Sequence, residues 1–368
     1  MTSTTFSAVD HAHMARALRL AERGAYTTRP NPMVGCVLAL GEEVVGEGFH
    51  VRQGEPHAEV HALAAAGARA RGATAYVSLE PCAHHGSTPP CADALIAAGV
   101  TRVVAACRDP FPQVDGRGLD GLRAAGIVAE AGLMEAAARE LNRGFFSRIE
   151  RDRPWLRVKL AMSLDGRTAL PDGESKWITS EAARLDAHRW RARAGALLTA
   201  SGTVLADDPL LTVRLGDETP VAVPLRVVLD VGLATPVRAR VLDDSAPTLF
   251  FHAPDVKLSS VFRQRDRVAV AERDGRLDLD AVLRELARRG INEVQLEAGA
   301  TLAGALMQAG LVDELLLYVA PVLLGEQGRP LLAGIAPQSM AQRLGLRVVD
   351  TRQVGPDLRL LLRPQAGP

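Results

Sequence analysis

The sequence has few cysteines and no long apolar run, and both absences narrow what it encodes. Four Cys in 368 residues are too few for a disulfide-stabilised scaffold. No run of about 18 uncharged apolar residues is present, and the longest candidate, 315–324, is interrupted by Pro321. The N-terminus lacks the basic segment and apolar stretch of a signal peptide. These absences predict a cytoplasmic protein without a membrane span.

The sequence also lacks an excess of either charge. Its 43 basic and 43 acidic residues give a formal net charge of zero, which argues against a general nucleic-acid or membrane-surface binder. Nearly all basic residues are arginine, with lysine only at 159, 176 and 257. Hydrophobic residues make up 47%, which is enough for two cores, and the length also points to two domains.

Periodicity in the first 150 residues predicts alternating helices and strands. Residues 8–23 have helical spacing, and two apolar runs separated by Gly41 predict a hairpin. A helical pattern at 56–71 begins with Pro56 at the favoured first helical position. The expected order is helix 8–23, strands 33–40 and 43–48, helix 56–71, strand 75–79, helix 92–98, strand 103–107, helix 119–125, strand 127–129 and helix 134–148. This alternation predicts a mainly parallel sheet covered on both faces.

A charged segment that ends in proline, 150–154, is expected to separate two domains, 1–150 and 154–368. The second domain repeats the alternation of strands and helices. Its expected elements are strand 155–162, helix 180–194, strands 196–200, 225–230, 247–251 and 267–271, helix 278–289, strand 293–297, helix 301–309 and strand 313–320. Both halves are therefore predicted to be α/β domains.

Three metal-binding side chains and one carboxylate stand near predicted helix starts. His57 and Glu59 open one helix, and Cys82 and Cys91 flank an eight-residue gap. One imidazole and two thiolates give Zn²⁺ three protein ligands and leave a fourth position for water, as in catalytic zinc sites. Zinc lowers the pKa of bound water toward about 7, and a carboxylate that is not a ligand can carry protons to a leaving amine. Except for the longer gap, the pattern matches the zinc-deaminase signature, so we predict a hydrolytic deaminase with Glu59 as its catalytic residue.

Two other interpretations of these residues are open. His57 and His61 share a helix face, as in metalloprotease helices, but Ala58 stands where those helices have glutamate. Alternatively, the two cysteines are small core side chains and His57 only caps a helix. The position of Glu59 in register with the other residues disfavours this second interpretation.

The motifs around these residues resemble the bifunctional deaminase–reductase family of riboflavin biosynthesis. They are PNPMVGC at 30–36, HAEVHAL at 57–63 and EPCAHHGSTPPCADALIAAGV at 80–100. The resemblance implies an α/β protein with an N-terminal cytidine-deaminase-like α/β/α domain and a C-terminal dihydrofolate-reductase-like α/β domain. The first domain of that family removes the 2-amino group of a diaminopyrimidinone ribosylamino 5′-phosphate. The implied partner is this small phosphorylated pyrimidine, not a nucleic acid or a membrane.

The resemblance also assigns substrate contacts in the first domain. Asn31 and His50 are expected to contact the substrate, and His84, with the loop 83–90, is expected to lie over its ribose phosphate. Asn31 stands between two prolines, so a simple turn explains it equally well. Ser87 departs from the family pattern, in which a basic residue is expected, and this puts the phosphate contact there in question.

Downstream motifs resemble the reductase half of the same family. They are RVKLAMSLDGRTALPDGESKWITS from Arg157, ASGTVLADDPLLTVR at 200–214 and LEAGATLAGALMQAGLVDELLLYVAP at 296–321. NADPH is the implied hydride donor, and the ribosyl group, as its open-chain imine, is reduced to ribityl. No G-x-G-x-x-G follows a strand, so a Rossmann site is not indicated. The resemblance further implies a homodimer or higher oligomer formed through this domain.

Two sets of reductase-site residues follow from the resemblance. The cofactor is expected to be lined by Ala161, Trp177, Thr203, Asp207, Gly299, Ala300, Thr301, Leu302, Ala303, Gly304 and Ala305. The substrate is expected to be held by Ser175, Arg191, Leu211, Arg214 and Glu297.

Elementary chemistry gives these assignments unequal support. Gly299 precedes a predicted helix whose N–H groups suit a phosphate, and guanidinium binds phosphate bidentately. A solvated helix face would also explain Arg191, and surface or capping roles would explain Glu297 and Asp207. Val231 departs from the family pattern, which has a small polar residue beside the cofactor.

Two further functions are compatible with parts of the sequence. One is a deaminase of nucleosides or tRNA bases with a C-terminal domain that only binds. The other is a zinc-stabilised scaffold without activity. The zero net charge and the reductase motifs disfavour the first, and Glu59, which zinc binding does not need, disfavours the second. We therefore predict a bifunctional enzyme that first releases ammonia and then oxidises NADPH.

Overall fold

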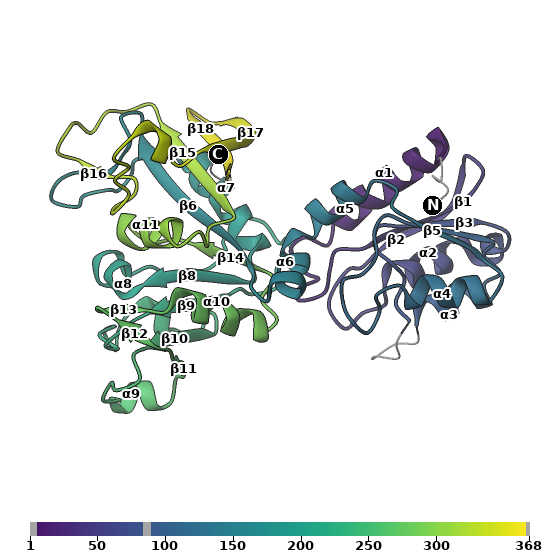
Figure 1. The fold of residues 1–368 in the computed structure, drawn as a ribbon, viewed down its shortest axis with the longest axis horizontal. Helices are drawn as coiled ribbons and strands as arrows, with labels where there is room; N and C mark the ends of the chain where they lie inside the picture. Colours follow the sequence, from purple (N-terminus) through teal and green to yellow (C-terminus); the bar gives the residue numbers. More distant parts are fainter. Residues whose placement is uncertain (1–5, 84–89, 366–368) are drawn as a thin grey trace. The chain divides into compact units, whose positions relative to one another are not determined.

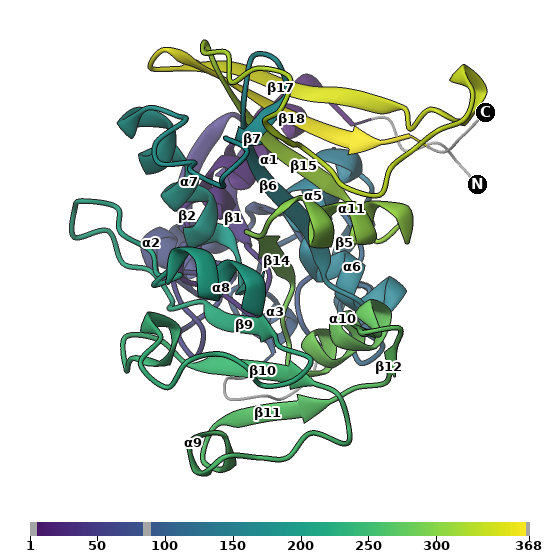
Figure 2. The same ribbon diagram turned by 90° about the vertical axis from the view of Figure 1, so that its left-hand side faces the viewer.

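The computed structural model describes residues 6–83 and 90–365, and the chain divides into two compact units. Unit 1 is Met1–Arg151 and unit 2 is Asp152–Pro368, each built on its own sheet (Figures 1 and 2). The segment expected to be a linker at 150–154 is partly helical, because the last helix of unit 1 continues to Arg151. Among the helices of the described part, none is both long and apolar enough to cross a membrane.

Unit 1 contains a five-stranded sheet in the order β2-β1-β3-β4-β5. Strands β3, β4 and β5 are parallel, whereas the expected hairpin β1–β2 makes two of the four pairings antiparallel. The strands are β1 (Gly35–Leu40), β2 (Glu43–Phe49), β3 (Thr74–Val77), β4 (Arg102–Ala105) and β5 (Val128–Ala131). The helices are α1 (Ala8–Glu22), α2 (Ala58–Ala66), α3 (Cys91–Ala97), α4 (Arg117–Ala124), α5 (Glu135–Leu141) and α6 (Arg143–Arg151).

Both faces of this sheet are buried, as the alternation of helices and strands predicted. Cys36 and Leu38 of β1 pack with α2, α3 and α4, while Val37 and Ala39 pack with α1, α5 and α6. Successive strand residues point to opposite faces, so a single apolar strand supplies both cores.

Two glycines of β2 let α2 lie directly on the sheet. A Cβ at Gly46 would come within 2.3 Å of the Ala62 carbonyl oxygen, and one at Gly48 within 2.6 Å of the Ala58 carbonyl oxygen. Side chains at these two positions would therefore push away the helix that carries His57 and Glu59 at its start.

Two predicted helices of unit 1 differ from the structure. The helix expected at 56–71 begins at Ala58 with His57 as its N-cap, so Pro56 lies outside it, and a short 3₁₀ turn follows at Gly67–Ala70. The single helix expected at 134–148 is two helices, α5 and α6. They separate at the buried Asn142, whose side chain hydrogen-bonds both the N–H and the carbonyl of Met33 at 2.8 Å. The hydrogen bonds from Asn142 to Met33 thus divide the expected single helix into two.

Unit 2 contains a nine-stranded sheet in the order β11-β10-β9-β8-β14-β6-β15-β18-β17, parallel from β11 to β15. Its strands are β6 (Trp155–Ser163), β8 (Ala196–Ala200), β9 (Leu225–Leu229), β10 (Thr248–His252), β11 (Asp266–Ala269), β14 (Glu293–Leu296), β15 (Glu314–Ala320), β17 (Leu346–Val354) and β18 (Asp357–Pro364). Its helices are α7 (Glu181–Arg193), α8 (Ser201–Asp207), α9 (Ser260–Arg263), α10 (Leu279–Arg288) and α11 (Ala300–Gln308). Short strands β7 (Arg167–Ala169) with β16 (Arg329–Pro330), and β12 (Glu272–Arg273) with β13 (Arg276–Leu277), form two small ribbons.

The central strands of this sheet are apolar along their whole length because both faces are covered. The antiparallel hairpin β17–β18 lies beyond residue 320, where the last expected strand ends, and was not predicted. The turn between these strands contains Gly355-Pro356, a dipeptide typical of turns, and this was the available signal. Helix α8, which follows β8 without an intervening loop, was also not predicted.

Candidate active sites

His57, Cys82 and Cys91 meet at one point in unit 1. Nδ1 of His57 lies 3.2 Å from Sγ of Cys91 and 3.6 Å from Sγ of Cys82, and the three ligand atoms lie within 4.8 Å of one another. Tetrahedral zinc, with Zn–N near 2.0–2.1 Å and Zn–S near 2.3 Å, separates a nitrogen and a sulfur ligand by about 3.6 Å. The spacing and the donor set therefore fit Zn²⁺, with a fourth position left for water.

Local structure brings the three ligands together from separate segments. His57 is the N-cap of α2 in extended conformation, and Cys91 is the first residue of α3. Cys82 follows β3, and its sulfur and carbonyl accept hydrogen bonds from the backbone N–H groups of Cys91 (3.3 Å) and Ala92 (3.2 Å). The Cys91 N–H, at the start of α3, favours negative charge on the Cys82 sulfur.

Hydrogen bonding sets the protonation of this cluster. The Cys91 thiol and then His57 hydrogen-bond the Cys82 sulfur, and together they lower the pKa of Cys82 to about 4 in spite of its burial. The same bond to Cys82 raises the pKa of His57. These hydrogen bonds favour the thiolate form of Cys82, and thiolate is the form that zinc requires.

Glu59 lies in the same site, on the first turn of α2. It is the second residue of α2, is 3% exposed, and its Oε2 has no hydrogen-bond partner in the described part of the chain. Burial raises the pKa of Glu59 to about 7. A buried carboxyl with a pKa near neutrality and an unpartnered oxygen is suited to accept and return a proton.

Asn31 and His50 lie beside the zinc ligands. The Asn31 side-chain nitrogen lies 3.2 Å from Nε2 of His50, and the His50 ring stacks edge-on against His57 with centroids 5.2 Å apart. Nδ1 of His50 lies 3.2 Å from the Pro56 carbonyl, so Nδ1 donates and Nε2 accepts from Asn31. Burial lowers the pKa of His50 and favours this neutral form. The predicted contacts of His84 and Ser87 lie outside the described residues.

The metalloprotease interpretation finds no support in the described residues. The metal-binding group formed there contains His57 and the two cysteines but not His61.

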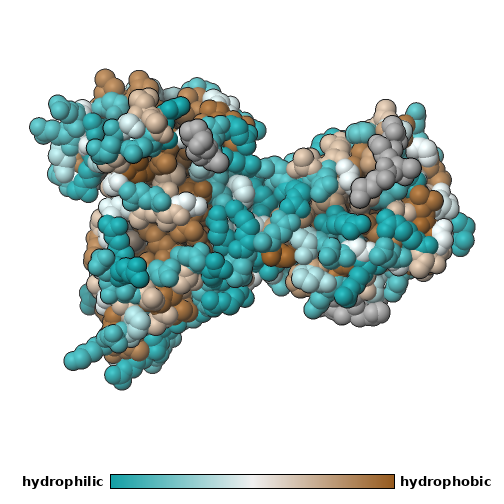
Figure 3. All heavy atoms as spheres, viewed as in Figure 1, coloured by the Kyte–Doolittle hydropathy of each residue, from teal (hydrophilic) through white to brown (hydrophobic). Residues whose placement is uncertain are grey.

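In unit 2 the predicted site residues gather at the carboxyl ends of neighbouring parallel strands. Glu297 follows β14, Thr203 lies on α8 directly after β8, and Ala161 lies near the end of β6. Strands β8, β14 and β6 are adjacent and parallel, so their carboxyl ends share one edge. Open parallel sheets bind ligands at this edge. Apolar side chains also line a hollow on the face of unit 2 that is visible in Figure 3.

Arg191 and Glu297 form a two-armed ion pair at this edge. Nε and Nη2 of Arg191 lie 2.6 and 2.7 Å from the two Glu297 oxygens, and Nη1 donates to the Thr212 carbonyl at 2.9 Å. Burial alone would raise the pKa of Glu297, but Arg191 outweighs it and lowers the pKa to about 2. Arg191 is therefore not on a solvated helix face. The two guanidinium nitrogens that could bind a phosphate bidentately bind the Glu297 carboxylate instead.

Trp177 and Asp207, both predicted to contact the cofactor, come from two segments that an ion pair joins. Lys176 lies 3.8 Å from Asp207 at the end of α8. Trp177 is 71% exposed, with the Arg184 guanidinium 4.5 Å above its ring. An exposed indole is available to stack on a planar ligand. Ser175 belongs to the same turn as Trp177, and its backbone carbonyl accepts a hydrogen bond from the Ile178 N–H at 3.2 Å.

The predicted cofactor loop from Gly299 to Ala305 divides into two parts. Gly299 is the N-cap of α11 and is exposed, as is Thr301, so this end presents backbone N–H groups to solvent. Ala303 and Gly304 are buried, and a Cβ at Gly304 would meet the Ala333 carbonyl at 1.9 Å. Packing against the core therefore explains the small residues in the second part.

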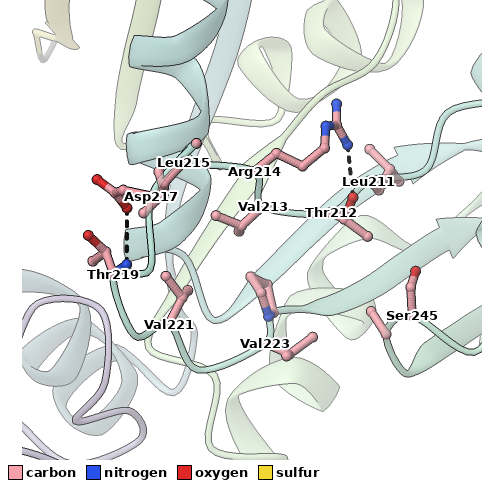
Figure 4. A pocket seen from close by; sticks show the side chains of 13 residues that line it. Leu211, Thr212, Val213, Arg214, Leu215, Asp217, Thr219, Val221, Val223 and Ser245 are labelled. Carbon is pink, nitrogen blue, oxygen red and sulfur yellow. Dashed lines mark hydrogen bonds between the residues drawn. The ribbon is translucent and has the colours of Figure 1, made fainter.

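Leu211 and Arg214 lie on one wall of a cavity of about 380 Å³, shown in Figure 4. The wall runs from 211 to 217, and Val221, Val223 and Ser245 lie opposite. Arg214 is exposed and donates to the Thr212 hydroxyl at 2.8 Å (Figure 4). Val231 follows β9 and packs partly against the core.

Sequence reasoning did not single out His188, Lys159 or Glu80. Nδ1 of His188 accepts the Arg214 N–H at 3.1 Å; burial, and then Arg191 and Arg214, lower the pKa of His188 to about 4. Burial lowers the pKa of Lys159 on β6, although Glu297 favours its charged form. Two features of the sequence could have indicated these residues. His188 stands one helical turn before Arg191, and Lys159 is a rare lysine inside an apolar strand. Glu80 contacts only backbone groups, which no sequence pattern reveals.

Comparison with known proteins agrees with this two-part architecture. Residues 7–107 match the family model of the cytidine and deoxycytidylate deaminase zinc-binding region, and residues 154–360 match that of the RibD C-terminal domain. The riboflavin biosynthesis protein RibD of Escherichia coli is 50% identical over 96% of this chain and 99% of its own length; that of Haemophilus influenzae is 45% identical over 98% and 99%.

Solved structures agree. RibD of Acinetobacter baumannii superposes with a TM-score of 0.91 at 44% identity over 97% of this chain and 99% of its own. A diaminohydroxyphosphoribosylaminopyrimidine deaminase/5-amino-6-(5-phosphoribosylamino)uracil reductase of Thermotoga maritima superposes with a TM-score of 0.85 at 31% identity over the same fractions.

Fold and site together define a zinc-dependent deaminase domain followed by an NADPH-dependent reductase domain. The predicted fold classes and both cofactors are thereby confirmed. The chain belongs to the RibD family of bifunctional riboflavin biosynthesis enzymes.

Proposed function

We propose that unit 1 converts 2,5-diamino-6-(5-phosphoribosylamino)pyrimidin-4-one to the corresponding uracil, with Glu59 as the proton carrier. The observation that carries this proposal is the buried, unpartnered Oε2 of Glu59 beside the cluster of His57, Cys82 and Cys91. Zn²⁺ held by these three residues would lower the pKa of a water toward about 7.

Glu59 moves the protons of the reaction. It takes one proton from the water as the C2–O bond forms and passes it to ring nitrogen N3. It then takes the remaining hydroxyl proton and delivers it to the 2-amino group as the C2–N bond breaks. The products are a C2 carbonyl and ammonia, so water supplies the oxygen and no redox change occurs. Asn31 and His50 hold the pyrimidine beside the zinc ligands, since the His50–Asn31 pair lies against His57. For His84 we propose the ribose phosphate contact on the resemblance alone.

Unit 2 then reduces the ribosyl group of the deaminated product. NADPH, when bound, would supply the hydride that reduces C1 of the open-chain imine, and protonation of the imine nitrogen would complete the ribityl amine. Arg191 holds Glu297 toward the substrate, whereas the exposed Arg214 binds the 5-phosphate. Ser175 and Leu211 complete the substrate contacts. Ala161, Trp177, Thr203, Asp207 and the exposed start of the Gly299–Ala305 loop bind the cofactor.

We further propose a homodimer or higher oligomer formed through unit 2. Strand β17 is an edge strand whose side chains are mostly exposed on both faces, including Leu346, Val348 and Val349. A partly apolar strand with one open edge favours pairing with another chain. Light scattering of the purified protein at several concentrations tests this, and a monomer at every concentration would contradict it.

The central experiment supplies the diaminopyrimidinone ribosylamino phosphate with and without NADPH. We expect ammonia release in both cases and NADPH oxidation only after ammonia has appeared. NADPH oxidation that precedes ammonia release, or ammonia release that needs NADPH, would contradict the proposed order.

A further inference from the structure

The Glu80 carboxylate is buried and bonds only to backbone N–H groups. It is 4% exposed. Oε1 accepts from the N–H groups of Gly118 (3.0 Å) and Leu119 (3.2 Å), and Oε2 accepts from those of Asp109 (3.2 Å) and Gly116 (3.0 Å). A carboxylate has about four acceptor sites, so these four bonds use its whole capacity.

Three of these donors belong to the start of α4. Gly116 is the N-cap, and it has no side chain that could cap the helix. Its φ of 86° is in the left-handed region, which glycine adopts without strain. The carboxylate from a distant segment thus serves as the cap of α4.

The same carboxylate stands two residues before the zinc ligand Cys82. The intervening Pro81 has a restricted φ, and its carbonyl lies so close to α4 that a Cβ at Gly118 would meet it at 1.9 Å. The Glu80 N–H also donates to the Cys107 carbonyl at 3.0 Å. The backbone leading to Cys82 is thus fixed by the side chain of Glu80, by its N–H and by contact with Gly118.

We propose that Glu80 is a positioning residue of the zinc site: by bonding the 109–119 segment it holds the Cys82 sulfur where it meets His57 and Cys91. Glu80 touches neither the metal nor the substrate in this role. The inference rests on the proposed ligand set.

Two variants test the role of Glu80: one changes the Glu80 carboxylate, and the other changes the contact between Gly118 and Pro81. Glu80→Gln keeps the shape of the side chain but turns an N–H₂ group toward two backbone donors. Gly118→Ala keeps Glu80 and places a methyl group against the Pro81 carbonyl. The matched control for the second is Gly121→Ala on the same helix, because nothing lies within 4 Å of a Cβ at that position. Ser7→Ala, which removes the cap of α1, is the control for the loss of a helix cap as such.

Zinc release from the full-length holoprotein to a chromogenic chelator is the first measurement. Loss of a group that orients a metal ligand commonly costs 10–100-fold in metal affinity, so we expect about 10–100-fold faster release from Glu80→Gln and Gly118→Ala. Gly121→Ala and Ser7→Ala should release zinc at the wild-type rate. The second measurement is the thiolate-to-metal absorption of the Co²⁺-substituted proteins, which should shift only in the first two variants.

Wild-type release and absorption in Glu80→Gln would overturn the proposal and leave Glu80 as a helix cap only. Failure of unit 1 to fold in that variant would also overturn it, because Glu80 would then be a general folding determinant. Cys82→Ser separates the proposal from the ligand assignment. If that variant retained zinc with unchanged metal absorption, the ligand set itself would be wrong.

Discussion

The two active sites of this chain are assembled in opposite ways. In unit 1 three ligand atoms within 4.8 Å come from the starts of two helices and the segment after a strand, and backbone hydrogen bonds fix them. In unit 2 the site residues are spread along one edge of a nine-stranded sheet, and side-chain pairs such as Arg191–Glu297 orient them. A compact metal site is therefore sensitive to single atoms, whereas a site spread along a sheet edge should lose function in graded steps.

The largest expected effect is removal of a zinc ligand. Cys91→Ser removes one of the three protein ligands, so it should lose bound zinc and essentially all ammonia release. NADPH oxidation with pre-deaminated substrate should be unchanged, because unit 2 has its own core and sheet. Metal analysis and the two separate assays test this. Equal loss of both activities would show that the two sites are not independent.

The second-largest effect is expected from loss of the proton carrier, Glu59. Glu59→Gln should retain one zinc per chain but release ammonia about 10²–10⁴-fold more slowly, the usual contribution of a general acid–base group. Single-turnover ammonia measurements beside zinc analysis check this. Full deaminase activity in the variant would remove Glu59 from its assigned role.

In unit 2 two arginines should behave differently. Arg191→Ala leaves Glu297, whose side chain is 13% exposed, without its ion-pair partner, so up to about 3–5 kcal/mol of the unfolding free energy of unit 2 should be lost along with NADPH oxidation. Arg214→Ala removes an exposed group, so stability should change by less than about 0.5 kcal/mol. Its KM for the deaminated substrate should rise roughly 10-fold, as expected for a lost charge-assisted hydrogen bond.

Urea unfolding and NADPH oxidation at saturating cofactor separate these two outcomes. Unchanged kinetics in either variant would remove that arginine from the site. Stability loss in Arg214→Ala as large as in Arg191→Ala would contradict the difference drawn between them.

The smallest expected effect concerns pH. The pKa of His188 falls from an ordinary value of 6.5 to about 4 in the folded protein, so the unfolded chain binds the proton more readily between these values. The contribution of neutral His188 is therefore complete above about pH 6.5 and is lost as the pH falls toward 4. His188→Asn, which can still accept the Arg214 N–H, should show a weaker fall.

Thermal unfolding of unit 2 at pH 7.5, 6 and 4.5 measures this. A contribution on the order of 1 kcal/mol, after allowance for solvent screening, corresponds to about 2–4 °C in Tm. Parallel curves for the wild type and the variant would exclude His188 as the titrating group.

Local pattern predicted most of the fold and the zinc cluster. Helix α1 and strands β1 and β2 lie within a few residues of expectation because their periodicity matches their burial. The break at Asn142 was not predictable, because its cause is a hydrogen bond to Met33, 109 residues away. The hairpin β17–β18 was missed because β17 is largely exposed and lacks a buried face.

The reductase site was less accessible to sequence reasoning. The family resemblance supplied Arg191 and Glu297, but not that they bond to each other across 106 residues. Nor did it reveal that His188 holds the Arg214 backbone or that Ala303 and Gly304 face the core.

The sequence by itself determined the zinc chemistry and the alternation of elements, because residue type and short spacing specify both the donor set and the burial of each strand. Only the tertiary structure decided which carboxylate is paired, which is left unpartnered and which is used as an anchor. Glu297 forms an ion pair with Arg191, Glu59 keeps a free buried oxygen and Glu80 binds four backbone N–H groups. Three identical side chains differ in chemistry because folding gives each a different set of partners, and those partners come from distant parts of the chain.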